Sequence, residues 1–266
     1  MKIGFIGTGN MGGALAKAVA AALGGECLYL ADANVEKAAA LAGALGASLV
    51  NNDYVAAECD FVFLGVKPQM LEALLAELTP TLAQREMAPV LVSMAAGVSI
   101  DKVAAWIGVE CPIIRIMPNT PVAVGEGTVL YSLSPSVTEA EREVFCAVLS
   151  AAGRLCRMPE KLLDAGTAVS GCGPAFVCLF IEALADGGVE CGLPRQQAME
   201  LAVQTVLGTA RQLQATESHP GALKDGVCSP GGSTIAGVHA LEAGGFRSLA
   251  MDAVCAAYER TQELGK

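Results

Sequence analysis

The run Gly7-Thr8-Gly9-Asn10-Met11-Gly12, near the start of the chain, has the residue types and spacing of a phosphate-binding turn. In such a turn the first glycine permits a tight bend and the second lets the backbone approach a pyrophosphate. The third lets the following helix pack closely on the preceding strand. Free N–H groups and the helix dipole then favour the anion. The turn alone is a weak signal in a chain with 30 glycines, so its surroundings decide.

The residues around this turn fit a strand–turn–helix unit. A short apolar run at 3–6 is typical of a buried parallel strand, and a helical pattern starts near Asn10. Asp32 ends a second apolar strand, Leu28–Ala31, about 20 residues after the turn, where nucleotide-binding units place an acidic residue beside the adenine ribose. We therefore predict a dinucleotide site whose contacts include Gly7, Thr8, Gly9, Asn10, Met11 and Gly12.

Strands and helices alternate through the first half of the chain. The further predicted strands are Ser48–Val50, Asp60–Val66, Val90–Ser93 and Ile113–Met117. A hairpin-like stretch near Gly125–Leu133, a helix over Thr138–Ala152 and a strand at Leu155–Met158 close this half. The alternation predicts a Rossmann-type, doubly wound parallel α/β sheet with its ligand cleft at the carboxyl ends of the strands. Residues placed at these ends, and predicted to bind the cofactor, are Asn52, Val66, Lys67, Met94, Ala95 and Ala96.

The pattern changes near Pro159, after which no strand signal remains. Long helical segments follow at Gly173–Val189, Pro194–Gln214 and Ser233–Gly265, the last interrupted at Gly244-Gly245. We predict two domains, a dinucleotide-binding domain over 1–158 and an all-α domain over 159–266. The later helices are apolar on more than one face, as helices that pack against another subunit are. The sequence therefore predicts a homodimer joined through the helical domain.

Composition narrows the classes of partner. The net charge is −10 and no basic run occurs, so we expect no nucleic-acid partner. The longest uncharged stretch, Ala165–Ile181, is short for a membrane span and is broken by glycine and proline, so we expect no membrane partner. The 10 cysteines form no CxxC pair and do not cluster with the 2 histidines. This pattern predicts reduced thiols, no metal site and, with no leader ahead of the first strand, a cytoplasmic protein.

Four motifs together resemble the pyrroline-5-carboxylate reductase family. They are Val66-Lys67-Pro68, Met117–Pro121, Ala168–Phe176 (AVSGCGPAF) and Leu223–Arg247 (LKDGVCSPGGSTIAGVHALEAGGFR). The resemblance covers essentially the whole chain in order, and the SPGGST stretch is its most specific part. It implies reduction of the cyclic imine L-1-pyrroline-5-carboxylate to L-proline, the last step of proline biosynthesis, by NADPH or NADH. It also implies dimers, or assemblies of dimers, joined through the helical domain.

A turn in the helical half suits the carboxylate of such a substrate. Ser233 opens a helix after a Pro-Gly-Gly turn, so backbone N–H groups near Gly232 and Ser233 can point at one anion. In the family, the residues matching Ser233 and Thr234 meet the carboxylate and the ring nitrogen. We take Thr234 as the candidate catalytic residue, with a helix-capping hydroxyl as the alternative. The predicted substrate-binding residues are Glu160, Ser229, Gly231, Gly232, Ser233 and Thr234.

Glu160 enters this set only because it matches a family position that contacts the ligand. The alternative for Glu160 is a solvated carboxylate in the first turn of a helix.

The need for a side chain that transfers a proton distinguishes this reaction from that of a related hydroxyacid dehydrogenase. Ketone reduction needs a group that moves a proton, commonly lysine or histidine, yet the helical half holds only Lys161, Lys224 and Lys266 as lysines. An imine can take its proton before hydride arrives, so positioning and electrostatics suffice. A non-catalytic NAD(P)H-binding sensor is the alternative from another class. The retained SPGGST stretch argues against it, because a sensor has no use for a carboxylate-binding turn.

The residues leave the choice of nicotinamide cofactor open. Asp32 suits the free ribose hydroxyls of NAD and repels a 2′-phosphate. Asn34, the N-cap of a predicted helix over Val35–Leu45, and Lys37 can instead hold that phosphate. The family often works with NADPH, and Asn52 matches a family position near the adenosine half. We expect NADPH, with NADH as the alternative, and Asp32 either turned aside or partly tolerated beside the phosphate.

Overall fold

The computed structural model describes residues 1–264, which pack into two units. The first unit comprises residues 1–172 together with the chain from Ala257 onward, and the second is Gly173–Ala256. Gly265, the end of the last predicted helix, and Lys266 lie outside the described residues.

Within the described residues, the first unit contains an eight-stranded sheet in the order β3-β2-β1-β4-β5-β6-β7-β8. Neighbouring strands are parallel except for β6 and β7, which are antiparallel. The chain leaves β1 toward β2 and β3, then returns across β1 to β4, so the predicted doubly wound Rossmann sheet is confirmed. The strands are β1 Ile3–Ile6, β2 Leu28–Ala31, β3 Ser48–Leu49, β4 Phe61–Leu64, β5 Val90–Ser93, β6 Ile113–Pro118, β7 Gly127–Leu133 and β8 Gly153–Arg157.

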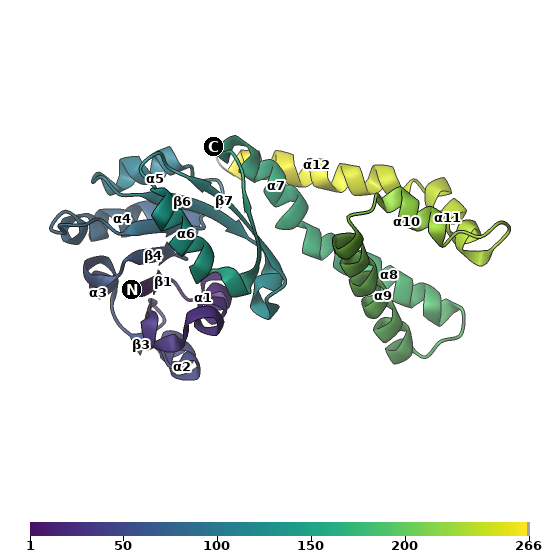
Figure 1. Cartoon of the computed structure of the whole chain (residues 1–266), viewed down its shortest axis with the longest axis horizontal. Coiled ribbons are helices and arrows are strands. Elements are labelled where there is room, and N and C mark those ends of the chain that lie inside the picture. The colour runs from purple at the N-terminus through teal and green to yellow at the C-terminus, as the bar shows by residue number, and fades with distance from the viewer. Residues whose placement is uncertain (265–266) are drawn as a thin grey trace. The chain divides into compact units, whose positions relative to one another are not determined.

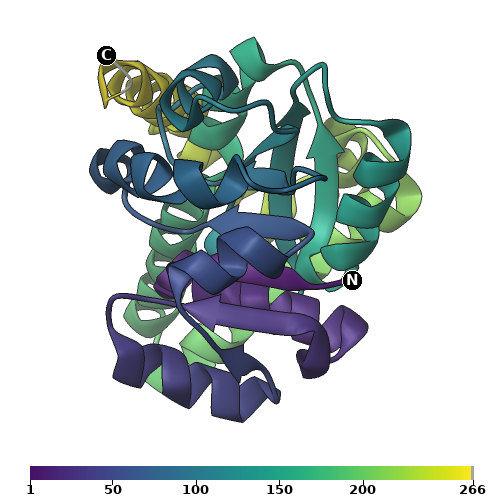
Figure 2. The same cartoon turned by 90° about the vertical axis from the view of Figure 1, so that its left-hand side faces the viewer.

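Helices cover both faces of this sheet, as Figures 1 and 2 show. Strand side chains alternate between the faces, and Phe5 stacks on Phe63 at 4.5 Å on the face covered by α1, α2 and α6. Val62 and Leu64 point to the other face, against α3, α4 and α5. The helices are α1 Asn10–Leu23, α2 Val35–Leu45, α3 Asn52–Glu58, α4 Pro68–Leu82, α5 Ile100–Ile107, α6 Glu139–Val148 and α7 Leu163–Ser170, with 3₁₀ turns η1 Gly25–Cys27, η2 Thr120–Val124, η3 Ser150–Ala152 and η4 Glu160–Leu162.

Helices α3 and α5 are not assigned in the sequence analysis, which names only the strands before and after them. Each begins at a polar N-cap: Asn51 Oδ1 accepts from the Tyr54 N–H at 2.8 Å, and Ser99 Oγ accepts from the Lys102 N–H at 3.2 Å. These caps were readable in the sequence, because Asn and Ser satisfy the free N–H groups of a helix start.

Helix α7 packs on the sheet although it follows the predicted domain boundary. Arg115 on β6 pairs with Glu160 and Asp164, and the Asn119 amide donates to the Ser170 carbonyl at 3.0 Å. The packing boundary therefore falls after Cys172, inside the predicted helical domain. The predicted boundary after residue 158 stays a prediction about domains.

The second unit is built from helices alone within its described residues, and little of its apolar surface is covered. Helices α8 and α9 pack through small residues, with Ala185, Ala198 and Ala202 buried between them. Many large apolar side chains on this unit are exposed, among them Leu179 and Leu201. The helices are α8 Gly173–Glu190, α9 Arg195–Thr216, α10 Pro220–Gly226, α11 Ser233–Ala243 and α12 Phe246–Leu264, the last of which runs on into the first unit.

One described helical segment, Glu160–Glu190, is long and apolar enough to cross a membrane by length and composition, and 11% of its most apolar window is buried. A single such helix is weak evidence, because core helices of soluble proteins pass the same test. The expected absence of a membrane partner and the cytoplasmic location stay predictions.

Candidate active site

The glycine-rich turn joins β1 to α1 at the carboxyl edge of the sheet. Gly7 has φ +95°, a left-handed conformation that glycine adopts without strain. A Cβ at Gly12 would lie 2.1 Å from the Gly7 carbonyl oxygen, so only glycine allows α1 to approach the turn this closely. A Cβ at Gly9 would meet nothing within 4 Å, which leaves open space above the backbone. The geometry matches the bend, the open approach and the close packing expected of the three glycines.

The start of α1 faces this open space. Its N-cap, Gly9, provides no side-chain hydrogen bond to the first turn of the helix. The N–H groups of the first turn have no partner within the helix, so they remain available for an anionic ligand. A pyrophosphate fits here, because the backbone is bare at Gly9.

The Asp32 carboxylate is turned toward the glycine-rich turn. Its Oδ2 accepts from the Thr8 N–H at 2.6 Å and the Thr8 hydroxyl at 3.0 Å, and its Oδ1 accepts from the Asn34 N–H at 2.8 Å. Partial burial raises the pKa of Asp32, but these hydrogen bonds and the charge of Lys37 outweigh it, so the pKa lies below its ordinary value. Asp32 therefore ties the loop after β2 to the loop after β1. Its orientation relative to a bound cofactor stays a prediction.

Two cavities meet at Gly9. The larger, about 600 Å³, is lined by Gly7, Gly9, Asn52, Val66 and Lys67 of the predicted set, with Asp32. The smaller, about 280 Å³, is lined by Thr8, Gly9, Asn10 and Lys37 of that set. The structure thus brings together most of the predicted cofactor residues from the ends of β1, β2, β3 and β4.

Other predicted cofactor residues line neither cavity. Met11 and Gly12 pack α1 on the sheet, and Asn34 caps α2 by accepting from the Lys37 N–H at 3.0 Å. Met94, Ala95 and Ala96 follow β5, and Ala95 is buried in the core. Cofactor contact by these residues stays a prediction.

Sequence reasoning missed several residues that line the cavities. Helical spacing could have identified them, since they lie one or two turns into α1 or α4, after loops that were already predicted to bind the cofactor. They include Lys17 in the smaller cavity and Gln69, Met70, Ala73, Leu74 and Glu77 in the larger.

The substrate-binding turn predicted at Ser229–Thr234 lies in the second unit. Gly231 has φ +68°, and the Gly232 N–H donates to the Ser229 carbonyl at 3.0 Å, which closes the turn before α11. Gly232 is the N-cap of α11 and gives no side-chain hydrogen bond. The first-turn N–H groups of α11 are therefore open to an anion.

Thr234 lies in the first turn of α11, and its side chain is exposed. Within residues 1–264 its hydroxyl forms no hydrogen bond, so in this structure Thr234 does not cap the start of α11. The hydroxyl is available to a ligand bound at the turn.

Glu160 has two partners within the first unit. Its Oε1 accepts from Arg115 Nη1 at 3.1 Å and from the Ile100 N–H, at the start of α5, at 2.8 Å. Arg115 Nη2 reaches Asp164 at 3.0 Å, while Arg115 Nε is buried without a partner among the described residues. The alternative of a solvated carboxylate is therefore wrong. Glu160 holds η4 against β6 and α5, and ligand contact by it stays a prediction.

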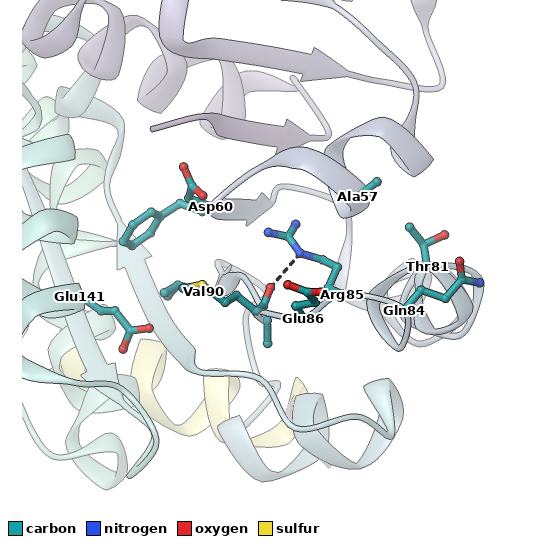
Figure 3. Close-up of a pocket in the computed structure, with 11 residues that line it drawn as sticks. Ala57, Asp60, Thr81, Gln84, Arg85, Glu86, Val90 and Glu141 are labelled. Carbon is teal, nitrogen blue, oxygen red and sulfur yellow. Dashed lines mark hydrogen bonds between the residues drawn. The ribbon is translucent and has the colours of Figure 1, made fainter.

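A separate cavity of about 640 Å³ lies at the amino ends of β4 and β5, beside Asp60 and Val90 (Figure 3). Arg85 lines this cavity. The Arg85 guanidinium donates to the carbonyls of Ala56 and Cys59, both at 2.8 Å, and of Met87 at 2.9 Å. Arg85 thus braces the loops around α3 and α4. This cavity is at the opposite ends of the strands from the glycine-rich turn and is no part of the nucleotide site.

Family models match both halves of the chain. Residues 160–264 match a model described as pyrroline-5-carboxylate reductase dimerisation. Residues 2–97 match a model described as NADP oxidoreductase, coenzyme F420-dependent.

Curated relatives and solved structures match the chain over most of its length. The pyrroline-5-carboxylate reductase of Arabidopsis thaliana is 42% identical over 268 residues, covering 100% of this chain and 96% of that protein. That of Glycine max is 48% identical over 216 residues, covering 81% and 77%. The crystal structure of Plasmodium falciparum pyrroline carboxylate reductase with NADP bound is 33% identical with a TM-score of 0.89, covering 100% of this chain and 98% of that one.

Proposed function

The chain belongs to the pyrroline-5-carboxylate reductase family, and we propose on that premise how its residues carry the reaction. The protein is an oxidoreductase that reduces the C=N bond of L-1-pyrroline-5-carboxylate with NADPH, giving L-proline. The observation that carries this function is the match to the Arabidopsis enzyme along 100% of the chain. That match includes both the nucleotide-binding turn and the SPGGST turn.

NADPH, when bound, supplies the hydride. Two features of the first unit support binding of its pyrophosphate at Gly9: the open space above that residue and the uncapped N-terminus of α1. Lys67 lines the larger cavity, where it contacts the cofactor or attracts the anionic substrate. A crystallised relative with NADP bound supports the same cofactor for this chain.

The substrate carboxylate binds the turn at the uncapped N-terminus of α11, with Gly231 and Ser233 supplying backbone N–H groups. The Gly232 N–H donates to the Ser229 carbonyl, so Gly232 shapes the turn around the carboxylate. The free Thr234 hydroxyl orients the ring nitrogen and holds its proton. A hydride delivered to the ring carbon of the protonated C=N bond would form the new C–H bond, and the π electron pair of C=N would pass to nitrogen, leaving a neutral secondary amine. No further proton is needed in this step, so the absence of a suitably placed lysine is no obstacle.

The protein forms a homodimer through its helical half. The proposal rests on the match of residues 160–264 to a dimerisation model and on the exposed apolar side chains of α8, α9 and α11. Such side chains destabilise a monomer in water unless a partner covers them.

The function is tested by oxidation of NADPH and of NADH with pyrroline-5-carboxylate at neutral pH, with proline measured as product. Proline formed in proportion to cofactor consumed supports the function, and the two values of kcat/KM rank the cofactors. Tight cofactor binding without proline formation would overturn it in favour of a sensor. Turnover with a 2-hydroxy acid instead would favour a hydroxyacid dehydrogenase.

A further inference from the structure

The smaller cavity beside the glycine-rich turn is lined by faces of α1 and α2, together with Thr8 and Gly9 of the turn and Ala123 of η2. Asn10, Gly13, Ala14 and Lys17 follow one another at helical spacing on α1, and Lys37 and Leu41 do so on α2. A Cβ at Gly13 would lie 3.5 Å from Leu41 Cδ2, so a larger side chain at this position would take space from the cavity. The small residues Gly13 and Ala14 therefore leave room between the helices next to Gly9.

Two lysines and no carboxylate line this cavity, in a chain whose net charge is −10. Within residues 1–264, neither the Lys17 nor the Lys37 ammonium group forms an ion pair within 4.0 Å, although the charge of Lys37 acts on Asp32 and lowers its pKa. Long side chains on a helix point toward its N-terminus, so Lys17 is directed toward Asn10 and the turn. Two like charges that share a cavity repel each other, and an anion between them removes that repulsion.

The neighbouring carboxylate does not oppose an anion here. Asp32 lines the larger cavity but not the smaller. Its Oδ2 accepts hydrogen bonds from Thr8, and its Oδ1 accepts one from Asn34. Its negative charge is therefore partly neutralised by N–H dipoles and is turned toward the loop backbone.

We propose that Lys17, acting with Lys37, binds the 2′-phosphate of NADPH in the cavity between α1 and α2 and so determines the preference for NADPH over NADH. The inference rests on the proposed function, because it assigns a residue to the cofactor of that reaction. Lys37 lies in the first turn of α2, after the loop that carries Asp32, and was predicted from the sequence. Lys17 is on the preceding helix, and only the fold brings it to the same cavity.

The test compares two nucleotides that differ only in the 2′-phosphate, 2′,5′-ADP and 5′-AMP, by calorimetric titration of the whole protein. Lys17→Gln is expected to weaken 2′,5′-ADP binding roughly tenfold and to leave 5′-AMP binding unchanged, since one charge-assisted contact is lost. Lys17→Arg is expected to restore the affinity, because the cation returns. Lys2→Gln is the control for the loss of one positive charge away from the turn, since Lys2 precedes β1 and pairs with Glu58 at 2.7 Å.

Two results would overturn the inference. One is an unchanged affinity of Lys17→Gln for 2′,5′-ADP. The other is an equal loss for both nucleotides, which indicates a distorted cavity. The proposed function fails separately, by the absence of proline formation in the unsubstituted protein, and that result leaves the nucleotide titrations interpretable.

Discussion

Asp32 is a single carboxylate that holds two loops of the nucleotide site together. It accepts hydrogen bonds from Thr8 in the glycine-rich turn and from Asn34 in the loop before α2. A residue at this position usually discriminates between cofactors by meeting the ribose. Here its oxygens are engaged by the protein, so its main contribution is to the geometry of the turn.

Asp32→Asn is expected to lower the free energy of unfolding by about 1 kcal/mol at neutral pH, because the bonds lose their charge assistance at a half-exposed site. The loss is measured by urea denaturation. Equal midpoints for the two proteins at neutral pH would contradict the coupling of the loops.

The difference in stability between the unsubstituted protein and the Asp32→Asn variant is expected to depend on pH. The pKa of Asp32 is lowered in the folded state, so its stabilisation is present above the unfolded-state pKa of about 3.9 and is lost as the pH falls through the folded-state value. The difference in stability between the unsubstituted protein and the Asp32→Asn variant is therefore expected to stay constant above about pH 5 and to shrink below about pH 4. Denaturation midpoints across this range test it, and a difference that grows toward acid pH would contradict it.

Thr234 is the residue on which the chemistry of the proposed function depends. Thr234→Val keeps the shape of the side chain but removes the hydroxyl that orients the ring nitrogen, so kcat/KM is expected to fall at least tenfold. The dissociation constant of NADPH is expected to stay the same, since the cofactor turn is in the other unit. Thr234→Ser is the control that keeps a hydroxyl and most of the activity. Unchanged kcat/KM in the valine variant would refute the role.

At the scale of elements, the sequence predicted the strands and helices that are determined by local residue patterns. Strands β1, β2 and β5 and helices α1 and α2 follow from apolar runs, helical spacing and the Asn34 cap. The short helices α3 and α5 were missed because each offers only two or so turns of periodicity. The placement of Glu160 was unpredictable for another reason: its partner Arg115 is 45 residues away in sequence and meets it only in the fold.

The residues of the candidate site also fall into two groups, those that a local motif predicts and those that only the fold brings to the site. Turn residues such as Gly9 and Lys67 follow from motifs next to strands and lie in the cavities. Lys17 belongs to no motif, and it reaches the smaller cavity because α1 and α2 pack side by side on one face of the sheet.

The contact between α1 and the turn can be tested by adding one methyl group. Gly12→Ala places a Cβ 2.1 Å from the Gly7 carbonyl oxygen, so α1 must move away from β1. We expect a loss of about 2 kcal/mol in stability, as for overpacking, together with weakened NADPH binding. Thermal unfolding and cofactor titration measure the two effects.

Gly43→Ala on α2 is the matched control, because a Cβ there meets nothing within 4 Å. It is expected to stabilise the protein by about 0.5–1 kcal/mol through helix propensity and to leave cofactor binding unchanged. Equal effects of the two substitutions would contradict the packing argument.

At the scale of the whole molecule, the helical unit cannot account for its own stability as a single copy. Its buried core consists of Ala185, Ala198 and Ala202, while Leu179 is 65% and Leu201 57% exposed. Burial of apolar area stabilises a fold by about 25 cal/mol per Å², and three alanines supply little of it. The remaining apolar surface is therefore expected to be covered by a second chain.

Leu179→Glu tests this covering directly. Glutamate is well solvated at an exposed position of a single chain, but at a subunit interface it buries an unpaired charge, so dimers are expected to dissociate. Sedimentation equilibrium at micromolar concentration measures the mass, expected as twice the chain mass or a multiple of it for the unsubstituted protein. Met87→Glu is the matched control: Met87 is 81% exposed but belongs to the sheet unit, so its substitution leaves the mass unchanged. A monomeric unsubstituted protein would contradict the proposed assembly, and monomers from Leu179→Glu alone place the interface on α8.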